Sequence, residues 1–422
     1  MSISISGPGW LEDKNLQSVL AILNCAGEEA RIAGGAVRNA LLGEDVSDID
    51  IATTCVPEEV MRRAGAAGFK SVPTGIEHGT VTVIANGSPF EVTTLREDIE
   101  TDGRRAKVKF GRSWQADAER RDFTINGLYA DSDGEVVDLV GGVADIQQRM
   151  VRFIGDAETR IREDYLRILR FFRFFARYGD GRPDAEGLKA CARLKSGLDG
   201  LSPERVWAEL DKLLAATDPS RALLWMRQAG VLGKVLPETE KWGIDAIHGL
   251  VAAERALGWA PDALLRLEAI IPPNESRVRA LADRLRLSNR DSGRLVSWVA
   301  TPLPPDGISE TAFLKQLYRC DLQAMLDRLK LALASARTRG QENDEALVEA
   351  GAYGKLLAIA ERWQKPDFPL SGRDLLEQGF EPGEKLGAVL AQLETEWLES
   401  GFEPDKHTLI ARAIELARAD KD

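Results

Sequence analysis

The stretch GGAVRNALLGEDVSDIDIATT, residues 34–54, combines a double-glycine turn with two closely spaced aspartates. Residues 31–36 form a strand-like run that ends in this turn, and a helical pattern follows. Gly34 and Gly35 allow the backbone to approach a phosphate closely, and the start of the helix offers free N–H groups to the anion. Arg38, one turn into this helix, can add a charged contact.

The two aspartates of this stretch, Asp48 and Asp50, lie two residues apart on a predicted strand, residues 48–52. Their carboxylates therefore point to the same side. Each feature alone is more often a plain turn or a solvated strand face. Together, about ten residues apart, they predict a site where Mg²⁺ is held by two carboxylates and by substrate phosphates.

The sequence GGAVRNALLG followed by DIDIATT resembles the first motif of the polymerase-β-like nucleotidyltransferases. Within that superfamily it is most similar to the class II tRNA nucleotidyltransferases, the CCA-adding enzymes, and to bacterial poly(A) polymerases. The resemblance implies an α+β fold, in which a nucleotidyltransferase head with a mixed β-sheet precedes an all-helical neck, body and tail. It also implies that Asp48 and Asp50 are the catalytic, metal-binding carboxylates.

A second polar group is RRDFTIN, residues 120–126. Two arginines beside an aspartate and an asparagine could hold a triphosphate and a ribose hydroxyl together. An ordinary salt-bridged helix start capped by Asp122 is the alternative. The group resembles the second motif of the family, which implies that Arg121 contacts the nucleotide and that Asp122 and Asn126 serve the ribose.

A third group is EDYLRILRFFRF, residues 163–174, inside a run with helical spacing at 160–178. On one helix Asp164 and Arg167 would be neighbours, and the pair could present an acceptor and a donor to cytosine or adenine. A surface ion pair is the alternative, but four phenylalanines indicate a buried helix whose arginines need anionic partners.

This third group resembles the motif with which the family selects the incoming base through amino acids. The resemblance assigns Asp164 and Arg167 to the base, and it also matches Arg170 and Arg173 to the nucleotide site. Helical geometry turns Arg173 away from Asp164. Phosphate binding, tRNA binding and packing therefore stay open for Arg170 and Arg173.

Three weaker similarities accompany these motifs. Glu91, in a strand-like run at 90–95, could be a third carboxylate near the metal or could face solvent. Residues 97–120 are polar, and 100–110 resemble a flexible loop of the family. SPERVWAELDKLL, residues 202–214, resembles the last helical motif of the nucleotide-binding region.

Strand signals dominate the first third of the chain and nearly vanish after about residue 156. Residues 79–85 and 90–95 are β-branched runs that predict a hairpin around a four-residue turn at 86–89. Helical spacing recurs at 160–178, 203–216, 219–230, 276–298, 310–336, 343–363 and 384–399. We expect a catalytic head at 1–147, a neck with the nucleotide-selecting helix at 148–217, a body at 218–350 and a tail in contact with tRNA at 351–422.

The 422 residues include 55 basic and 67 acidic ones, a formal charge of −12. This excludes a protein that coats nucleic acid by bulk charge. Residues 146–182 nevertheless carry nine arginines against five acidic residues. A local basic stripe on an acidic chain favours an RNA recognised by shape, such as tRNA, over arbitrary RNA tails.

Cysteine and histidine usage excludes other classes of site. The four cysteines and three histidines are scattered, so a zinc site is improbable and a histidine–aspartate hydrolase domain is excluded. The first residues lack the pattern of a signal peptide, and no apolar run reaches the length of a membrane span. We expect a cytoplasmic protein with reduced cysteines and no membrane partner, and we infer no protein partner.

The sequence thus predicts an Mg²⁺-dependent enzyme that adds C, C and A to the 3′ end of tRNA from CTP and ATP. A poly(A) polymerase shares all three motifs and is the first alternative, together with an enzyme that adds only C or only A. A catalytically idle RNA-binding protein conflicts with the intact Asp48 and Asp50. A nucleotidyltransferase for small molecules would not need the second and third motifs or so long a helical half.

Overall fold

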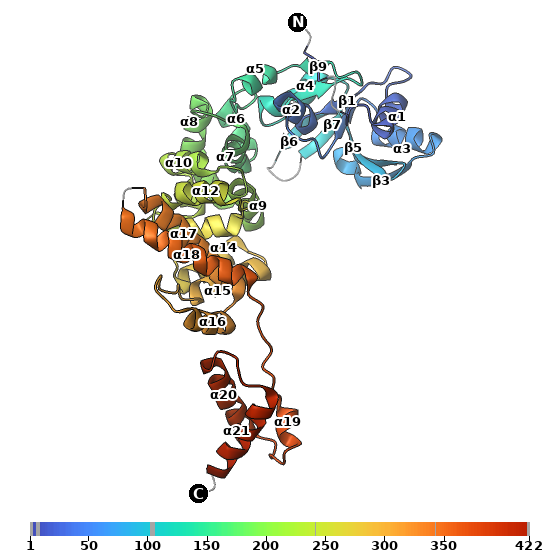
Figure 1. The fold of residues 1–422 in the computed structure, drawn as a ribbon. Coiled ribbons are helices and arrows are strands. Elements are labelled where there is room, and N and C mark those ends of the chain that lie inside the picture. Colours follow the sequence, from blue (N-terminus) through green and yellow to red (C-terminus); the bar gives the residue numbers. More distant parts are fainter. Residues whose placement is uncertain (1–2, 6–8, 102–105, 241, 342, 420–422) are drawn as a thin grey trace. The chain divides into compact units, whose positions relative to one another are not determined.

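The computed structural model describes residues 3–5, 9–101, 106–240, 242–341 and 343–419. The chain divides into two compact units, residues 1–241 and residues 242–422. Figure 1 shows that strands occur only in the first of these units, within the part of the chain that the structure describes.

The first unit contains a seven-stranded sheet in the order β3-β4-β5-β2-β1-β8-β9. β2 and β5 run parallel, and every other neighbouring pair is antiparallel, so the predicted mixed sheet is confirmed. Its strands are β1 (Ala30–Ala33), β2 (Asp50–Thr53), β3 (Lys70–Gly75), β4 (Thr80–Ala85), β5 (Ser88–Thr94), β8 (Leu128–Ala130) and β9 (Val136–Asp138). The helices beside it are α1 (Lys14–Leu23), α2 (Gly35–Leu42) and α3 (Pro57–Ala66).

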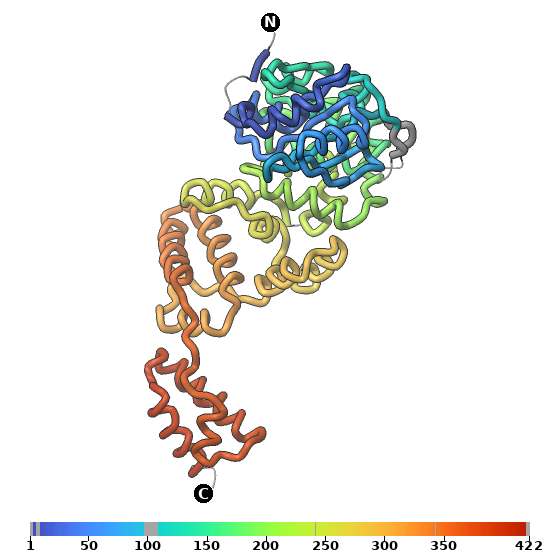
Figure 2. The backbone as a smooth tube through the Cα atoms, turned by 90° about the vertical axis from the view of Figure 1, so that its right-hand side faces the viewer, coloured from blue at the N-terminus to red at the C-terminus, as the bar shows by residue number. Residues whose placement is uncertain are grey.

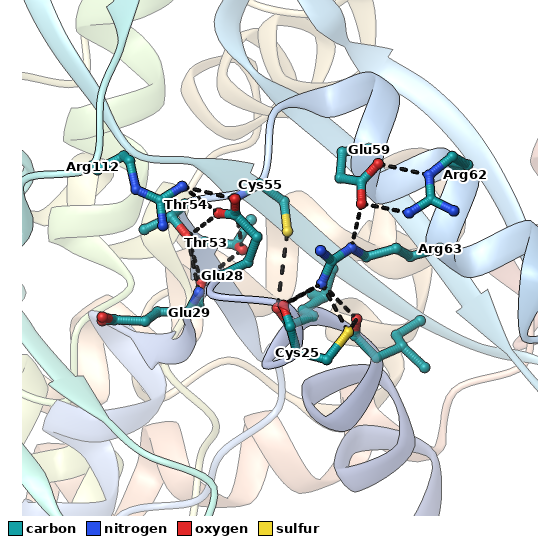
Figure 3. A network of polar contacts seen from close by, with 12 residues as sticks. Cys25, Glu28, Glu29, Thr53, Thr54, Cys55, Glu59, Arg62, Arg63 and Arg112 are labelled. Atoms are coloured by element: carbon teal, nitrogen blue, oxygen red, sulfur yellow. Dashed lines mark hydrogen bonds and ion pairs between the residues drawn. The ribbon is translucent and has the colours of Figure 1, made fainter.

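The end of β2 is anchored by a polar network (Figure 3). Thr53 donates its hydroxyl to the backbone oxygen of Glu29 at 2.8 Å, and the Thr54 hydroxyl bonds to Glu28. Glu28 also binds Arg112 at 2.7 Å, and these contacts hold its pKa below the usual value. Because β2 begins at Asp50, fixing its far end also fixes the position of that carboxylate.

In the same figure Arg63 ties α3 to α1. Its guanidinium donates to the backbone oxygens of Ile22, Leu23 and Cys25 and pairs with Glu59 at 2.6 Å. Such bonds satisfy carbonyls that the end of α1 leaves without an intrahelical partner.

Two local predictions differ from the structure. The hairpin between β4 and β5 closes on the two residues Asn86 and Gly87, both with positive φ, because Asn-Gly fits the tight turn that twisted strands require. The predicted loop at 97–120 contains an antiparallel pair of strands, β6 (Arg96–Thr101) and β7 (Ala106–Phe110), and a helix, α4 (Trp114–Glu119). Residues 102–105, within the segment expected to be flexible, lie outside the described residues.

The predicted single helix at 160–178 is two helices in the structure, α6 (Ala157–Glu163) and α7 (Leu166–Tyr178). Asp164 takes an extended conformation between them, with φ −154° and ψ 109°. Its carboxylate accepts the backbone N–H of Leu166 at 3.0 Å, which satisfies a free donor at the new helix start. The other helices of this unit are α5 (Gly142–Gln147), α8 (Ala185–Leu194), α9 (Pro203–Leu214), α10 (Ser220–Gln228) and α11 (Leu232–Val235).

The phenylalanines of α7 are buried, as their number predicted. Phe171 stacks on Phe153 with ring centroids 5.4 Å apart, and Phe174 packs on Phe123 at 5.1 Å. Phe123 belongs to the second sequence motif, so this aromatic core holds the second motif against the third.

Helices are the regular secondary structure of the second unit's described residues, and they are joined by non-helical connections (Figure 2). The predicted helix at 276–298 breaks at Arg286, which has φ +51°, and that at 310–336 breaks at Cys320 and Asp321, where Asp321 caps the next helix. The helices of the second unit are α12 (Ala246–Leu257), α13 (Ala263–Ile270), α14 (Glu275–Leu285), α15 (Asn289–Ala300), α16 (Glu310–Arg319), α17 (Leu322–Arg339), α18 (Asp344–Arg362), α19 (Gly372–Leu376), α20 (Glu384–Glu399) and α21 (Lys406–Ala419). The expected boundary between body and tail at residue 350 falls inside α18.

All four cysteines are free. Across the described ranges, no helix combines the length and the apolar character that crossing a membrane requires.

Candidate active site

A cavity of about 490 Å³ in the first unit collects residues from all three sequence motifs. Its charged lining carries four arginines and two aspartates, which gives a local excess of positive charge suited to a triphosphate. The lining residues are Gly34, Gly35, Arg121, Asp122, Asn126, Asp164, Leu166, Arg167, Arg170, Phe174 and Arg205.

The first motif contributes Gly34 and Gly35 to the lining of this pocket. Gly34 has φ +63°, and a Cβ atom built there would lie 2.9 Å from Nη1 of Arg121. Glycine is therefore needed both for the backbone conformation and for the room that Arg121 occupies. Arg121 is held in turn by the backbone oxygen of Asn126 at 3.1 Å and by Asp117 at 3.2 Å.

The acidic residues of the first motif lie at the start of β2, the central strand of the sheet. β2 starts at Asp50, so Asp48 precedes the strand rather than belonging to it. Glu91 of β5 is directly opposite Asp50 in the parallel register. Asp50 and Glu91 are solvent-exposed at the residue level, but nearby protein atoms partly desolvate their carboxylates. This desolvation raises the pKa of Asp50, Arg121 lowers it and Asp48 raises it. Partial desolvation and Asp50 likewise raise the pKa of Glu91.

These carboxylates fit a hard divalent cation. Their donors are all oxygen, and their mutual repulsion would be relieved by a positive ion. Among the residues described, no three His, Cys, Asp or Glu side chains are already grouped to hold a metal. That is compatible with an Mg²⁺ site of one or two carboxylates completed by substrate phosphates rather than an all-protein cage.

The second motif is locked by hydrogen bonds. Asp122 accepts from Nε and Nη2 of Arg170 at 2.7 and 2.5 Å and from the side-chain amide of Asn126 at 2.9 Å. Burial alone would raise the pKa of Asp122, but Arg170 and these hydrogen bonds bring it below the usual value. Asp122 is therefore a charged acceptor at pH 7.

The third motif differs from its expected geometry. Because the helix breaks at Asp164, this residue pairs with Arg205 of α9 at 2.6 Å, whereas Arg167 pairs with Glu163 at 2.5 Å. Asp164 and Arg167 line the same pocket, and the backbone N–H of Arg167 donates to the backbone oxygen of Asp164 at 3.0 Å, while their side chains pair with other residues. Their hydrogen-bonding groups are thus held by other protein residues.

Arg38 and Arg173 are not among the lining residues. Arg38 is buried, donates to Asn126 and to the Tyr178 hydroxyl at 2.7 Å, and stacks on the Tyr178 ring. Arg173 binds Glu209 of α9 at 2.5 Å. Both arginines are thus bound to other protein groups in this structure, and the nucleotide-binding roles predicted for Arg38, Arg170 and Arg173 stay predictions.

Arg205 lines the pocket and pairs with Asp164, although the sequence motifs did not single it out as a site residue. It lies in the segment at 202–214 whose resemblance to the family was noted, but nothing in its local spacing links it to Asp164, 41 positions earlier.

The arginines of residues 146–182 do not form a free basic stripe. Most are paired with acidic side chains, including acids outside the stretch such as Asp122, Asp145 and Glu209. The local excess of positive charge is therefore largely neutralised within the fold.

Two segments of the chain match known protein families. Residues 30–152 match the family described as "Poly A polymerase head domain", and residues 182–242 match "Probable RNA and SrmB-binding site of polymerase A". The chain is 35% identical to CCA tRNA nucleotidyltransferase 1, mitochondrial, of Mus musculus, over 94% of this chain and 89% of that protein. The chain belongs to the CCA-adding tRNA nucleotidyltransferase family.

Two further tRNA nucleotidyltransferases support this assignment along most of the chain. The CCA-adding enzyme of Levilactobacillus brevis is 31% identical over 93% of this chain and 95% of its own length. The crystal structure of the Bacillus stearothermophilus CCA-adding enzyme in complex with CTP has a TM-score of 0.76 and 26% identity, covering 97% of this chain and 98% of that one.

Proposed function

We propose that this protein adds C, C and A to the 3′ end of tRNA from CTP and ATP. The observation that carries the proposal is the pocket in which Asp164 and Arg167 stand beside Gly34, Gly35 and Arg121. Base-selecting and phosphate-binding groups thereby share one cavity. Relatives named as CCA-adding enzymes that match along nearly the whole chain favour this reading.

In this proposal, the triphosphate lies against the start of α2. Gly34 and Gly35 leave the backbone N–H groups of the first turn accessible to phosphate oxygens. Arg121, held by Asp117, adds a fixed positive charge. Asp122 and Asn126, held by Arg170 and Arg38, offer an acceptor and an amide to the ribose hydroxyls.

Asp48 and Asp50, with Glu91 beside Asp50, would hold Mg²⁺. When bound, the cation would neutralise phosphate charge and make the 3′-hydroxyl of the RNA a better nucleophile toward the α-phosphorus, with pyrophosphate leaving. Catalysis by the chain itself is then mainly positioning, because the pocket arginines are already fixed by ion pairs.

Base selection follows from hydrogen-bonding chemistry. Cytosine and adenine each present an exocyclic amine next to a ring nitrogen acceptor. The carboxylate of Asp164 can accept from the amine, and the guanidinium of Arg167 can donate to the ring nitrogen. Uracil and guanine present a carbonyl where the amine would be, and the carboxylate would repel it.

The test is to incubate the protein with tRNA lacking its 3′ CCA and with each labelled nucleotide in turn. We expect incorporation of C, C and then A, with no further addition. Long A tails on any RNA would indicate a poly(A) polymerase, and addition of C alone or A alone would indicate a partial enzyme. Binding of tRNA without incorporation of any nucleotide would indicate a catalytically idle RNA-binding protein.

We also propose that helices beyond residue 217, including the predicted tail at 351–422, contact the tRNA. The cytoplasmic location stays a prediction from the sequence, since the relatives include both mitochondrial and bacterial proteins.

A further inference from the structure

Arg160, on α6, contacts two parts of the nucleotide site without lining the pocket. Its guanidinium donates to the backbone oxygen of Arg120 and, at 2.6 Å, to that of Arg121. It also donates to Oε2 of Glu163 at 2.6 Å. One side chain thus joins the backbone of the second motif to the first residue of the third.

Glu163 passes this contact on to Arg167. The same Oε2 atom of Glu163 accepts from Nη1 of Arg167 at 2.5 Å. Nη1 of Arg167 also donates to the backbone oxygen of Arg160 at 2.7 Å. The guanidinium of Arg167 is therefore held by both the side chain of Glu163 and the backbone of Arg160, seven residues earlier.

The surroundings of Arg160 favour a fixed geometry. Its side chain is 12% exposed, and its planar fork reaches three acceptors at once, which a lysine could not reproduce. Burial lowers the pKa of Arg160, and the neighbouring Arg167 lowers it further, while Glu163 opposes both effects. Two guanidinium groups therefore share one carboxylate, so moving either one changes the position of the other.

We propose that Arg160 is a positioning residue for nucleotide selection, joining the triphosphate-binding side of the pocket at Arg121 to the base-selecting Arg167 through Glu163. The inference rests on the proposed function. Without Arg160, Glu163 would keep a single arginine partner and could turn with it. Arg167 would then sample several positions and lose its preference for one base edge.

The experiment compares Arg160→Lys and Arg160→Gln with the unaltered protein. The readout is the ratio of kcat/KM for CTP to that for UTP, on tRNA lacking CCA. We expect this ratio to fall roughly tenfold to a hundredfold, the size expected when a hydrogen bond to a charged group is lost. We expect the lysine variant to recover little of the ratio, since it keeps the charge but not the fork.

Arg162→Gln is the matched control. It removes an arginine from the same helix whose partner is Glu158 and whose side chain is more than half exposed. We expect this variant to keep the wild-type ratio. A merely structural role for Arg160 would lower the melting temperature and the fraction of active enzyme, but neither changes a ratio of two substrates measured on the same enzyme.

A second measurement separates this inference from the proposed function. Calorimetric titration with CTP and with UTP, in Mg²⁺ and without tRNA, reports selection apart from catalysis. A wild-type protein that adds no nucleotide to tRNA would reject the proposed function, whatever the titration shows. If wild type prefers CTP and both Arg160 variants keep that preference, the positioning role is overturned.

Should the Arg160 variants fail to fold, Glu163→Gln tests the same connection, because it keeps the shape of the side chain and removes its charge. We expect the same loss of preference for CTP over UTP. An unchanged preference in Glu163→Gln would overturn the connection between Arg160 and Arg167.

Discussion

At the residue scale, the carboxylates of the site divide into two groups. Asp122 and Asp164 are each tied to an arginine, Arg170 and Arg205, so their charge is balanced by the protein. Asp50 is exposed and instead has a pKa raised by partial desolvation and by the neighbouring Asp48. A carboxylate in that environment gains from a bound cation, which sets the proposed catalytic acids apart from the acids proposed to orient the nucleotide.

Replacing the catalytic acid should separate chemistry from binding. We expect Asp50→Asn to lower kcat for CMP addition by more than about a hundredfold, because it removes charge from the metal site. CTP binding should change only a few-fold, since the pocket arginines are untouched. Rapid-quench kinetics and nucleotide titration measure the two quantities.

The control for this prediction is Asp45→Asn. Asp45 is an exposed aspartate in the loop before β2, and its backbone oxygen accepts from the side-chain amide of Asn39 at 3.1 Å. The Asp45→Asn variant should keep wild-type kinetics. An Asp50→Asn enzyme with normal kcat would refute the metal assignment.

The ion pair between Arg205 and Asp164 should matter for base choice. In Arg205→Gln the carboxylate loses a 2.6 Å charged partner, so we expect UTP and GTP to be accepted roughly tenfold better relative to CTP and ATP. Incorporation assays with all four nucleotides give this ratio. Arg221→Gln, which breaks an exposed pair with Asp180, should leave the ratio unchanged, and equal ratios in both variants would remove Arg205 from selection.

At the element scale, the sequence motifs predicted the order of strands and helices around the pocket better than their breaks. The glycine turn follows from local pattern, and so does most of the strand predicted at 48–52 and of the helix predicted at 160–178. The break at Asp164 does not, because apolar periodicity continues across it and the residue that binds the freed carboxylate, Arg205, is distant in sequence.

Similarly, the polar composition of residues 97–120 predicted a loop, although β6 and β7 pair there. Polar residues are compatible with a two-stranded ribbon, whose hydrogen bonds are made by the backbone. Tertiary pairing, rather than residue type, decides such a segment.

The turn before α2 provides a test at the same scale. Gly34 and Gly43 both have positive φ, so alanine is strained at either position, by about 1 kcal/mol at the left-handed Gly43 and by more at Gly34, whose ψ is −108°. A Cβ at Gly34 would meet Arg121 at 2.9 Å, whereas Gly43 faces open space within 4 Å. We expect Gly34→Ala to raise the KM for CTP and ATP at least several-fold, and Gly43→Ala to lower stability alone.

Steady-state kinetics together with thermal unfolding distinguish the two glycine variants. Equal KM values in Gly34→Ala and Gly43→Ala would show that the contact with Arg121 is unimportant. Thermal unfolding is needed beside the kinetics because the backbone strain differs: Gly34 has φ 63° and ψ −108°, whereas Gly43 is left-handed helical with φ 69° and ψ 24°.

At the scale of the whole molecule, many charged side chains form ion pairs within their own unit. The arginines of 146–182 pair with acids of the head and of α9. The second unit contains a comparable buried group, in which Arg294 binds both Asp262 and Asp327 at 2.6 and 2.8 Å. The net charge of the sequence is therefore a poor guide to the charge that the protein surface presents to a partner. Many charged side chains are neutralised by ion pairs that composition does not reveal.

One buried acid in the second unit lacks such a partner. Glu268 of α13 is 2% exposed, and neither carboxylate oxygen has a hydrogen-bond partner in the described structure. Burial raises its pKa well above 4.5, Asp327 and Asp262 raise it further, and Arg294 and Arg328 act against them. Glu268 is therefore protonated in the folded state at pH values where the unfolded chain has released the proton.

This difference sets the direction of a pH effect on stability. Below about pH 4 both states hold the proton, and Glu268 contributes no pH dependence. As the pH rises above 4.5, only the unfolded state loses the proton, so the free energy of unfolding falls until the folded pKa is reached. We expect Glu268→Gln to raise the melting temperature at pH 7, by about 2–4 °C for each kcal/mol of penalty removed, and to match wild type at pH 4. Glu275→Gln replaces an exposed acid of α14 and should show no such gain in melting temperature. A Glu268→Gln protein that is less stable than wild type at pH 7 would contradict the assignment. The neutral amide would then have cost more free energy than the buried acid.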